Sequence, residues 1–168
     1  MEVLEALEIL KNNPTFKDWK KHNEETYFSY GFNVIEKEKE NPWQLGFFDK
    51  KNDKLTSFTV LEHDIIISPQ EDAFKPETME IMPIEVEKVK KNLQEILQKA
   101  EGLQKKEYKA EIPMKIIAIL QNLENFGTIW NITFVSRTMK TLNIKINSEN
   151  GNILEHKLHS LFEFQSKK

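Results

Sequence analysis

The order of hydrophobic patterns along the chain predicts an α+β fold made of two helix-plus-antiparallel-sheet units. Apolar residues recur at helical spacing in two stretches, and each stretch is followed by segments in which apolar and polar residues alternate. Short turns join these alternating segments, which is typical of antiparallel strands. With 168 residues, the chain can form one domain or two small units that share a core. We expect two stacked units at 1–76 and 77–168, whose sheets share an apolar interior through the two helices and which can pack as one globular domain.

The first unit begins with a broken helix. Apolar residues within 3–10 have helical spacing, and Pro14 ends this helix before a second short segment at 15–23. From residue 27 the period changes to two, which predicts a half-buried strand whose one face carries Phe28, Tyr30, Phe32 and Val34. Further strands are expected at 43–47, 55–61 and 64–67.

The second unit begins with the strongest helical pattern in the sequence. Residues 84–101 carry one apolar stripe, with Pro83 suited to the first turn and Gly102 suited to the position after the last turn. Alternation then returns and predicts strands at 114–120, 129–135, 142–147 and 152–158.

The two strand blocks can be aligned with one another. Trp43, Leu45 and Phe47 match Trp130, Ile132 and Phe134, and a leucine follows each tryptophan at the same distance. An internal duplication would explain this match. The pattern is also common to amphipathic hairpins, so a chance likeness stays open as the other interpretation.

The charged residues argue against nucleic acid as a partner. Arg137 is the only arginine among 24 cationic residues, and the net charge is -3. Lysine lacks the bidentate fork with which arginine binds phosphate and guanine. The charge is unevenly divided, because residues 1–84 hold 10 lysines and 17 acidic residues, whereas 85–168 hold 14 cationic and 10 acidic residues. The halves could dock on each other or face different partners, or the division could be chance.

Composition also bears on location and chemistry. The absence of cysteine excludes disulfides, thiolate catalysis and Cys-ligated metal sites. No run approaches the 18 or so apolar residues of a membrane span, and the N-terminus is acidic where an export signal would be basic. We expect a soluble, cytoplasmic protein, although a chain from which an export signal had been removed would read the same.

Residues that could carry catalysis are few. The sequence holds no phosphate-binding glycine loop, no HExxH and no GxSxG. His156 and His159 are three residues apart, so they would share a face on a helix but not on a strand. They are weak candidates for a metal site, and surface positions are the favoured interpretation, as for the acidic pairs Glu24–Glu25 and Glu71–Asp72. We expect no enzyme activity, no metal and no cofactor.

The aromatic residues are better candidates for binding. Trp43, Phe48, Trp130 and Phe126 could line a groove for a protein or peptide. The strand spacing of the tryptophans favours a core position over a groove. Phe48 breaks the alternation beside Phe47 and is therefore the best candidate for an exposed apolar contact. The apolar tail at 158–164 must dock on the body or contact a partner.

The second half carries an aromatic strand, a second strand and a closing turn, whose residues are Trp130, Ile132 and Phe134, then Leu142, Ile144 and Ile146, then Gly151, Ile153 and Leu154. These residues resemble a PepSY or PepSY-like domain, and the resemblance covers about 84–156. Asn147 stands where the family usually has Asp, and the first half lacks the closing glycine turn. The resemblance implies a helix with an antiparallel sheet and a small non-catalytic module, in a family associated with the inhibition or chaperoning of peptidases.

The sequence therefore predicts a non-catalytic module that binds a protein or peptide through a sheet edge or an aromatic groove. The alternative is a carrier of a small apolar ligand in a cleft between helix and sheet. An enzyme that uses His156, His159 or the acidic pairs is a third hypothesis. The sequence names no partner and sets no oligomeric state.

Overall fold

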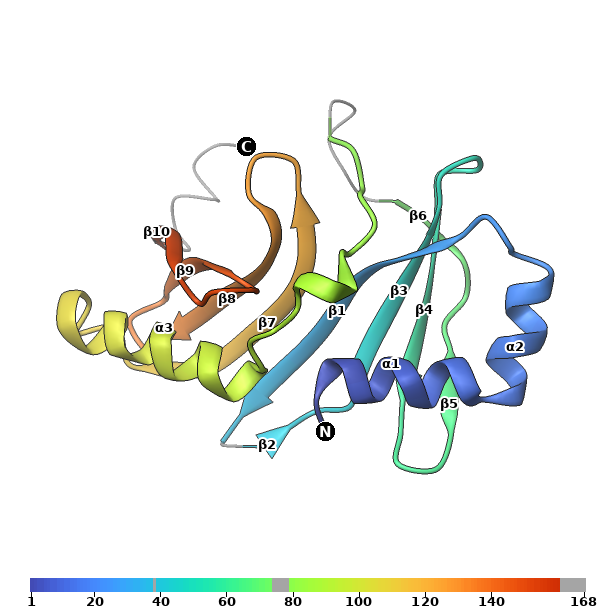
Figure 1. The fold of residues 1–168 in the computed structure, drawn as a ribbon. Coiled ribbons are helices and arrows are strands. Elements are labelled where there is room, and N and C mark those ends of the chain that lie inside the picture. Colours follow the sequence, from blue (N-terminus) through green and yellow to red (C-terminus); the bar gives the residue numbers. More distant parts are fainter. Residues whose placement is uncertain (38, 74–78, 161–168) are drawn as a thin grey trace.

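The computed structural model describes residues 1–37, 39–73 and 79–160 (Figure 1). Its strands form a ten-stranded sheet with the order β10-β9-β8-β7-β1-β3-β4-β5, in which β2 pairs with β1 and β6 with β4. The helices are α1 (Val3–Asn12), α2 (Pro14–Lys21) and α3 (Leu93–Glu107), with a short 3₁₀ turn at Val86–Lys88. The strands are β1 (Tyr27–Glu36), β2 (Lys39–Glu40), β3 (Trp43–Asp49), β4 (Lys54–Val60), β5 (Ile65–Ile67), β6 (Glu71–Asp72), β7 (Pro113–Leu123), β8 (Gly127–Ser136), β9 (Lys140–Asn147) and β10 (Ile153–Ser160).

The prediction of two stacked helix-plus-sheet units is wrong. Strand β1 pairs with β7, antiparallel, from Tyr30 opposite Gln121 to Glu36 opposite Lys115, so the strands of both halves belong to one continuous sheet. Glu36 and Lys115 also form an ion pair of 3.0 Å across this seam. A hydrophobic pattern shows that a segment is a half-buried strand but not which strand lies beside it. The coarser prediction of an α+β class holds.

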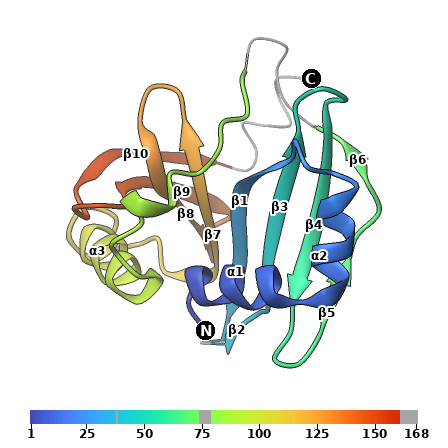
Figure 2. The same ribbon diagram turned by 45° about the vertical axis from the view of Figure 1, so that its right-hand side comes forward.

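Helices α1 and α3 lie across the same face of the twisted sheet (Figures 1 and 2). Helix α1 contacts β3 and β4, and α3 contacts β8. We call this side the helix face and the opposite side the open face. Every pair of neighbouring strands in the described sheet is antiparallel. Successive residues of a strand alternate between these two faces, except where a bulge shifts the register.

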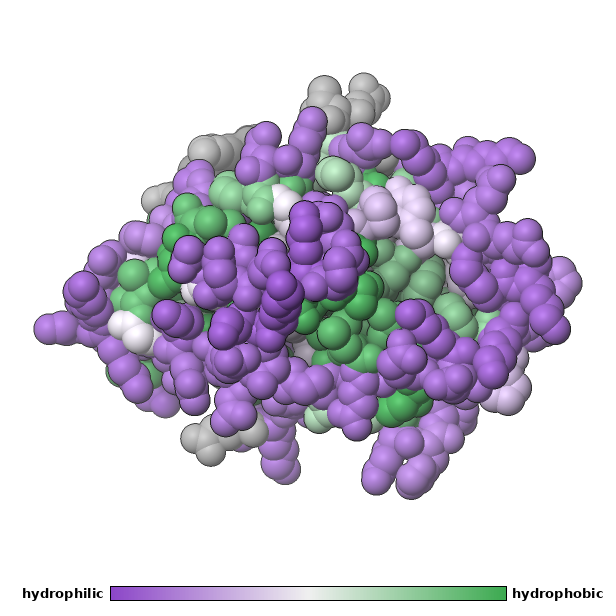
Figure 3. Space-filling model, viewed as in Figure 1, coloured by the Kyte–Doolittle hydropathy of each residue, from purple (hydrophilic) through white to green (hydrophobic). Residues whose placement is uncertain are grey.

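The helix face carries the main core. Trp43 and Trp130 are 2% and 0% exposed, with ring centroids 6.0 Å apart, and the residues aligned with them at Leu45, Phe47, Ile132 and Phe134 also lie in this core. Gly31 allows the close approach of α1, because a Cβ at this position would lie 2.8 Å from Val3 Cγ2. In the view of Figure 3, apolar residues gather over the middle of the molecule and hydrophilic residues surround them.

Strand β1 departs from the predicted single apolar face. The pairing with β3 shifts between Phe28, opposite Phe47, and Tyr30, opposite Gly46, which is the mark of a β-bulge. Phe28 is therefore part of the core on the helix face, whereas Tyr30 and the residues that alternate with it lie on the open face. Because of this one-residue shift, Phe28 lies on the helix face, whereas the other three residues of the predicted apolar set lie on the open face.

The predicted helix at 84–101 is displaced. Helix α3 begins at Leu93, because Asn92 caps it and forms a reciprocal capping box with Glu95. The N–H groups of Lys90 and Lys91 both donate to the Ser148 carbonyl, which fixes a turn where the stripe suggested helix. The other predicted helices and strands overlap observed elements.

Candidate functional site

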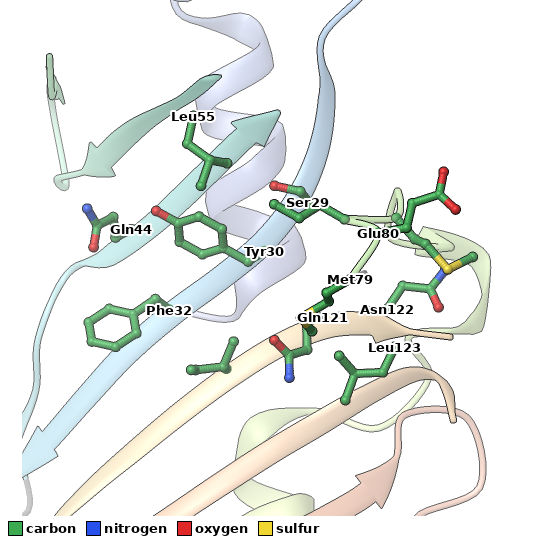
Figure 4. Close-up of a pocket in the computed structure, with 13 residues that line it drawn as sticks. Ser29, Tyr30, Phe32, Gln44, Leu55, Met79, Glu80, Gln121, Asn122 and Leu123 are labelled. Carbon is green, nitrogen blue, oxygen red and sulfur yellow. The ribbon is translucent and has the colours of Figure 1, made fainter. Parts of the chain in front are cut away.

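The open face holds a pocket of about 360 Å³ at the middle of the sheet, open to solvent on one side (Figure 4). Strands β1, β3, β4 and β7 form its floor, and the segment 79–82 forms its rim. Its lining residues are Ser29, Tyr30, Phe32, Gln44, Leu55, Met79, Glu80, Ile81, Met82, Ile119, Gln121, Asn122 and Leu123.

Tyr30 has its place on the floor because Gly46 has no side chain. A Cβ at Gly46 would overlap the Tyr30 ring, so the ring lies directly over the backbone of β3. The alternation of β1 then places Phe32 on the same face, with Ile119 opposite it on β7. The pocket floor is thus apolar on both sides of the β1–β7 seam.

Polar groups on β3 and β4 lie beside this apolar floor. Gln44 Nε2 donates to Ser57 Oγ over 2.9 Å, and the Tyr30 hydroxyl also bonds to Ser57. Burial raises the pKa of Tyr30 above its usual value of 10.0, although the Ser57 hydrogen bond opposes this change. The phenol therefore stays neutral and keeps its proton at neutral pH.

The rim is fixed to the sheet by three hydrogen bonds. The Tyr27 hydroxyl donates to the Ile81 carbonyl over 2.6 Å, and Asn122 Nδ2 donates to the Pro83 carbonyl over 2.9 Å. The Ile84 N–H donates to the Phe28 carbonyl over 3.0 Å. Two side chains and one main-chain carbonyl of the neighbouring strands therefore hold the rim and the two residues that follow it.

This arrangement suits binding rather than proton transfer. The side chains of Gln44 and Gln121 offer both a donor and an acceptor, and the floor offers apolar surface. Such a site can hold an apolar group that lies next to a peptide-like polar group. Among the lining residues, Glu80 is the ionisable carboxylate, and it lies at the rim with its ion pair to Lys50 at 2.8 Å.

The two predicted tryptophans lie in the core and not in a groove. Trp43 Nε1 donates to the Met1 carbonyl and Trp130 Nε1 donates to the Lys91 carbonyl, so both indoles are buried and hydrogen-bonded. The core interpretation of these tryptophans is confirmed.

Phe48 and Phe126 have different surroundings. The prediction that Phe48 is exposed is wrong, because its side chain is 2% exposed and its ring packs edge-on against Tyr27 at 5.8 Å. Phe126 is half-buried in the turn between β7 and β8, with Lys145 Nζ 5.8 Å from its ring centroid. Neither residue lines the open-face pocket.

The two histidines point to opposite faces, since both lie on strand β10. His156 Nδ1 lies 2.6 Å from the Tyr108 hydroxyl and its Nε2 lies 3.8 Å from Glu107. Within the described ranges, no group of three His, Asp or Glu side chains could hold a metal ion. The apolar tail falls partly at 161–168, outside the described residues.

Sequence reasoning missed the pocket residues Tyr30, Gln44 and Gln121. They belong to three strands whose adjacency no local pattern reveals. One signal was present, because Gly31 and Asn33 alternate with Tyr30 and Phe32, so either face of β1 could have been the outer one.

The comparisons with known proteins show the fold alone. The sequence matches no family model and no curated protein. The fold is similar to that of a protein from Clostridium difficile 630 whose crystal structure is described as a "putative lipoprotein", with a TM-score of 0.55 and 11% identity over 86% of this chain and 90% of that chain. Within the described residues, no helix is long and apolar enough to cross a bilayer.

Proposed function

We propose that this chain is a non-catalytic module that binds a protein or peptide by holding an apolar side chain in the open-face pocket. The observation that carries the proposal is the pocket itself, which combines an apolar floor at Phe32 and Ile119 with the amide groups of Gln44 and Gln121. A peptide offers both an apolar side chain and main-chain groups that bond to amides.

The shape of the pocket favours a peptide over a free small molecule. Carrier sites usually bury about 70–90% of a ligand's surface. This pocket is open on one side, so part of its occupant stays outside, as the main chain of a peptide would. The carrier of a small apolar ligand is kept as the alternative because about 360 Å³ is large enough for a small ligand.

The PepSY resemblance agrees with this proposal, since it implies a non-catalytic module that acts on other proteins. For location, we propose the cytoplasm. Cell fractionation tests this proposal, and recovery with the membrane or outside the cell would contradict it.

The binding proposal can be tested with peptides selected from a random displayed library. A synthetic selected peptide should shift the amide NMR signals of β1, β3, β7 and 79–82. Phe32→Ala should weaken its binding by about tenfold or more, because Phe32 lines the floor. Val34→Ala is the matched control, since Val34 lies on the same strand and face but outside the lining and should change binding by less than about twofold.

Two results would overturn the peptide proposal. One is a library that yields no binder, and the other is a set of binders whose NMR shifts avoid the pocket strands. Native mass spectrometry distinguishes peptide binding from the alternative, the carrier of a small apolar ligand. A small molecule that stays bound to the purified chain, and that Phe32→Ala no longer binds, would identify a carrier.

A further inference from the structure

The two edges of the sheet differ in length. The edge at β5 spans Ile65–Ile67, whereas the edge at β10 spans Ile153–Ser160. Short edge strands resist pairing with other chains, and long ones invite it, since their outer N–H and C=O groups can bond to another strand. Within the part of the chain that the structure describes, β10 pairs with β9, and no strand pairs with residues 153–158 on the outer side.

The side chains of β10 do not block such pairing by charge. Glu155 lies 2.9 Å from Lys145 and 3.0 Å from Lys157, so the charges on the open face of this edge balance. Lys157 keeps 60% of its side chain exposed and can exchange partners without a buried contact being lost. Ile153 and Leu154 are 37% and 41% exposed at the start of the same strand.

The order of these charges makes β10 complementary to itself. In an antiparallel pair of identical strands, directly opposite residues point to the same face, so the twofold axis passes through a residue pair. An axis at Glu155 places two glutamates opposite each other, and an axis at Lys157 places two lysines opposite each other. An axis at His156 places Glu155 opposite Lys157 of the second copy, and it does so twice.

We propose that two copies of this chain associate through β10, antiparallel, with the twofold axis at His156. The two sheets then continue into one, and Leu154 of each copy, 41% exposed in the single chain, lies opposite Leu158 of the other. His156 remains compatible with this register, because its ring is held toward α3 by the Tyr108 hydroxyl at 2.6 Å. The dimer leaves the open-face pocket of each copy uncovered, so it does not depend on the proposed peptide binding.

Charge exchange at the two positions tests this register. Analytical ultracentrifugation of the full chain over a concentration series should show a monomer–dimer equilibrium. Glu155→Lys and Lys157→Glu should each raise the dissociation constant by about tenfold or more, since each change turns two attractive cross-strand pairs into repulsive ones. The double variant E155K/K157E restores opposite charges and should return the dissociation constant to within about threefold of the original.

The matched control is the exposed ion pair Lys11–Glu8 on α1, with charges 3.5 Å apart. Reversing either of these charges should leave the dimer unchanged. Amide hydrogen exchange gives a second readout, since the β10 amides should become more protected as the concentration rises.

Two outcomes would overturn the proposal. If the chain stays monomeric at every concentration, the dimer does not form. If the β10 amides of that monomer are also protected from exchange at every concentration, the chain itself covers this edge. A dimer that neither single charge reversal weakens forms elsewhere on the surface. Peptide binding measured on the same variants should not change, so the two proposals can fail separately.

Discussion

The helix face and the open face of the same strands differ in what covers their side chains. On β8, Trp130 and Ile132 are fully buried beneath the helix side, whereas Asn131 and Thr133, on the open face, are half-buried. The fold is stabilised mainly from the helix face, because burial of apolar area is the largest favourable term. The open face therefore has residues available for binding, since their replacement costs less stability.

The strongest test of this difference is Trp130→Ala. Removing a fully buried indole should lower the free energy of unfolding by about 3–5 kcal/mol. Val135→Ala, on the open face of the same strand, should cost about 1 kcal/mol or less, because Val135 is half-buried. Urea unfolding followed by circular dichroism measures both. If the alanine variant does not fold, Trp130→Phe should still fold. Its free energy of unfolding should be lower by about 1–2 kcal/mol, because the hydrogen bond to the Lys91 carbonyl is lost. Equal losses on the two faces would contradict the comparison.

A second test uses glycines with opposite surroundings. Gly46→Ala should cost about 1–3 kcal/mol and displace the Tyr30 ring from the pocket floor, because the added methyl overlaps that ring. Gly102→Ala in α3 should instead stabilise the protein by up to about 1 kcal/mol, since nothing lies within 4 Å of its Cβ position. Thermal unfolding compares the two variants, and a neutral Gly46→Ala would show that the open face is less tightly packed than described.

The third test concerns a buried carboxylate at the end of the helix face. Glu111 accepts hydrogen bonds from Thr138 and from Ser136, the latter at 2.8 Å, and these hydroxyls, together with Lys140, hold its pKa below the usual 4.5 against the opposing effect of burial. A depressed pKa contributes stability that is present above about pH 4.5 and is lost as the pH falls through the lower, folded value.

Glu111→Gln removes this titration. The free energy of unfolding of the variant should be about 1 kcal/mol lower than that of the original chain at neutral pH. This difference should become smaller as the pH falls below about 4. Urea unfolding at a series of pH values measures the gap. A gap that is constant from neutral to acid pH would show that the charge of Glu111 does not stabilise the fold.

The smallest expected effect lies on the open face. Phe126→Leu removes the contact between the ring and Lys145 Nζ and should cost about 0.5 kcal/mol, which is usual for an exposed cation–π pair. In the Lys145→Met background the same change should cost less, and that difference is the value of the contact. A cost above about 2 kcal/mol would show that Phe126 belongs to the core.

Much of the fold could be predicted from local pattern. The alternation around Trp43 and Trp130 located both strands and their buried faces, because residues that face a core recur at every second position. The start of α3 was misplaced, because Val86 and Val89 extend the apolar stripe although Asn92 is the residue that caps the helix. A stripe shows which residues are buried, whereas a cap shows where the helix begins.

The candidate site could not be predicted in the same way. Phe48 was expected at the surface because it breaks an alternation, but the pairing of β1 with β3 places Tyr27 directly opposite it, and the two rings pack together. The pocket needs the pairing of β1 with β7, and the bulge after Phe28 decides which face of β1 lines it. Long-range pairing and a one-residue shift both leave no reliable local signal.

The seam between β1 and β7 has a consequence for synthesis. When the first half of the chain leaves the ribosome, β1 can pair with β3 but its other edge, from Tyr30 to Glu36, has no partner until β7 emerges. At roughly 5–20 residues per second, the residues between the end of β1 and the end of β7 take about 4–17 s to synthesise, and that edge has no partner during this time. An apolar strand edge left open during translation is a site for misassociation with neighbouring nascent chains. The central strand of the finished sheet is thus the most vulnerable strand of the growing one.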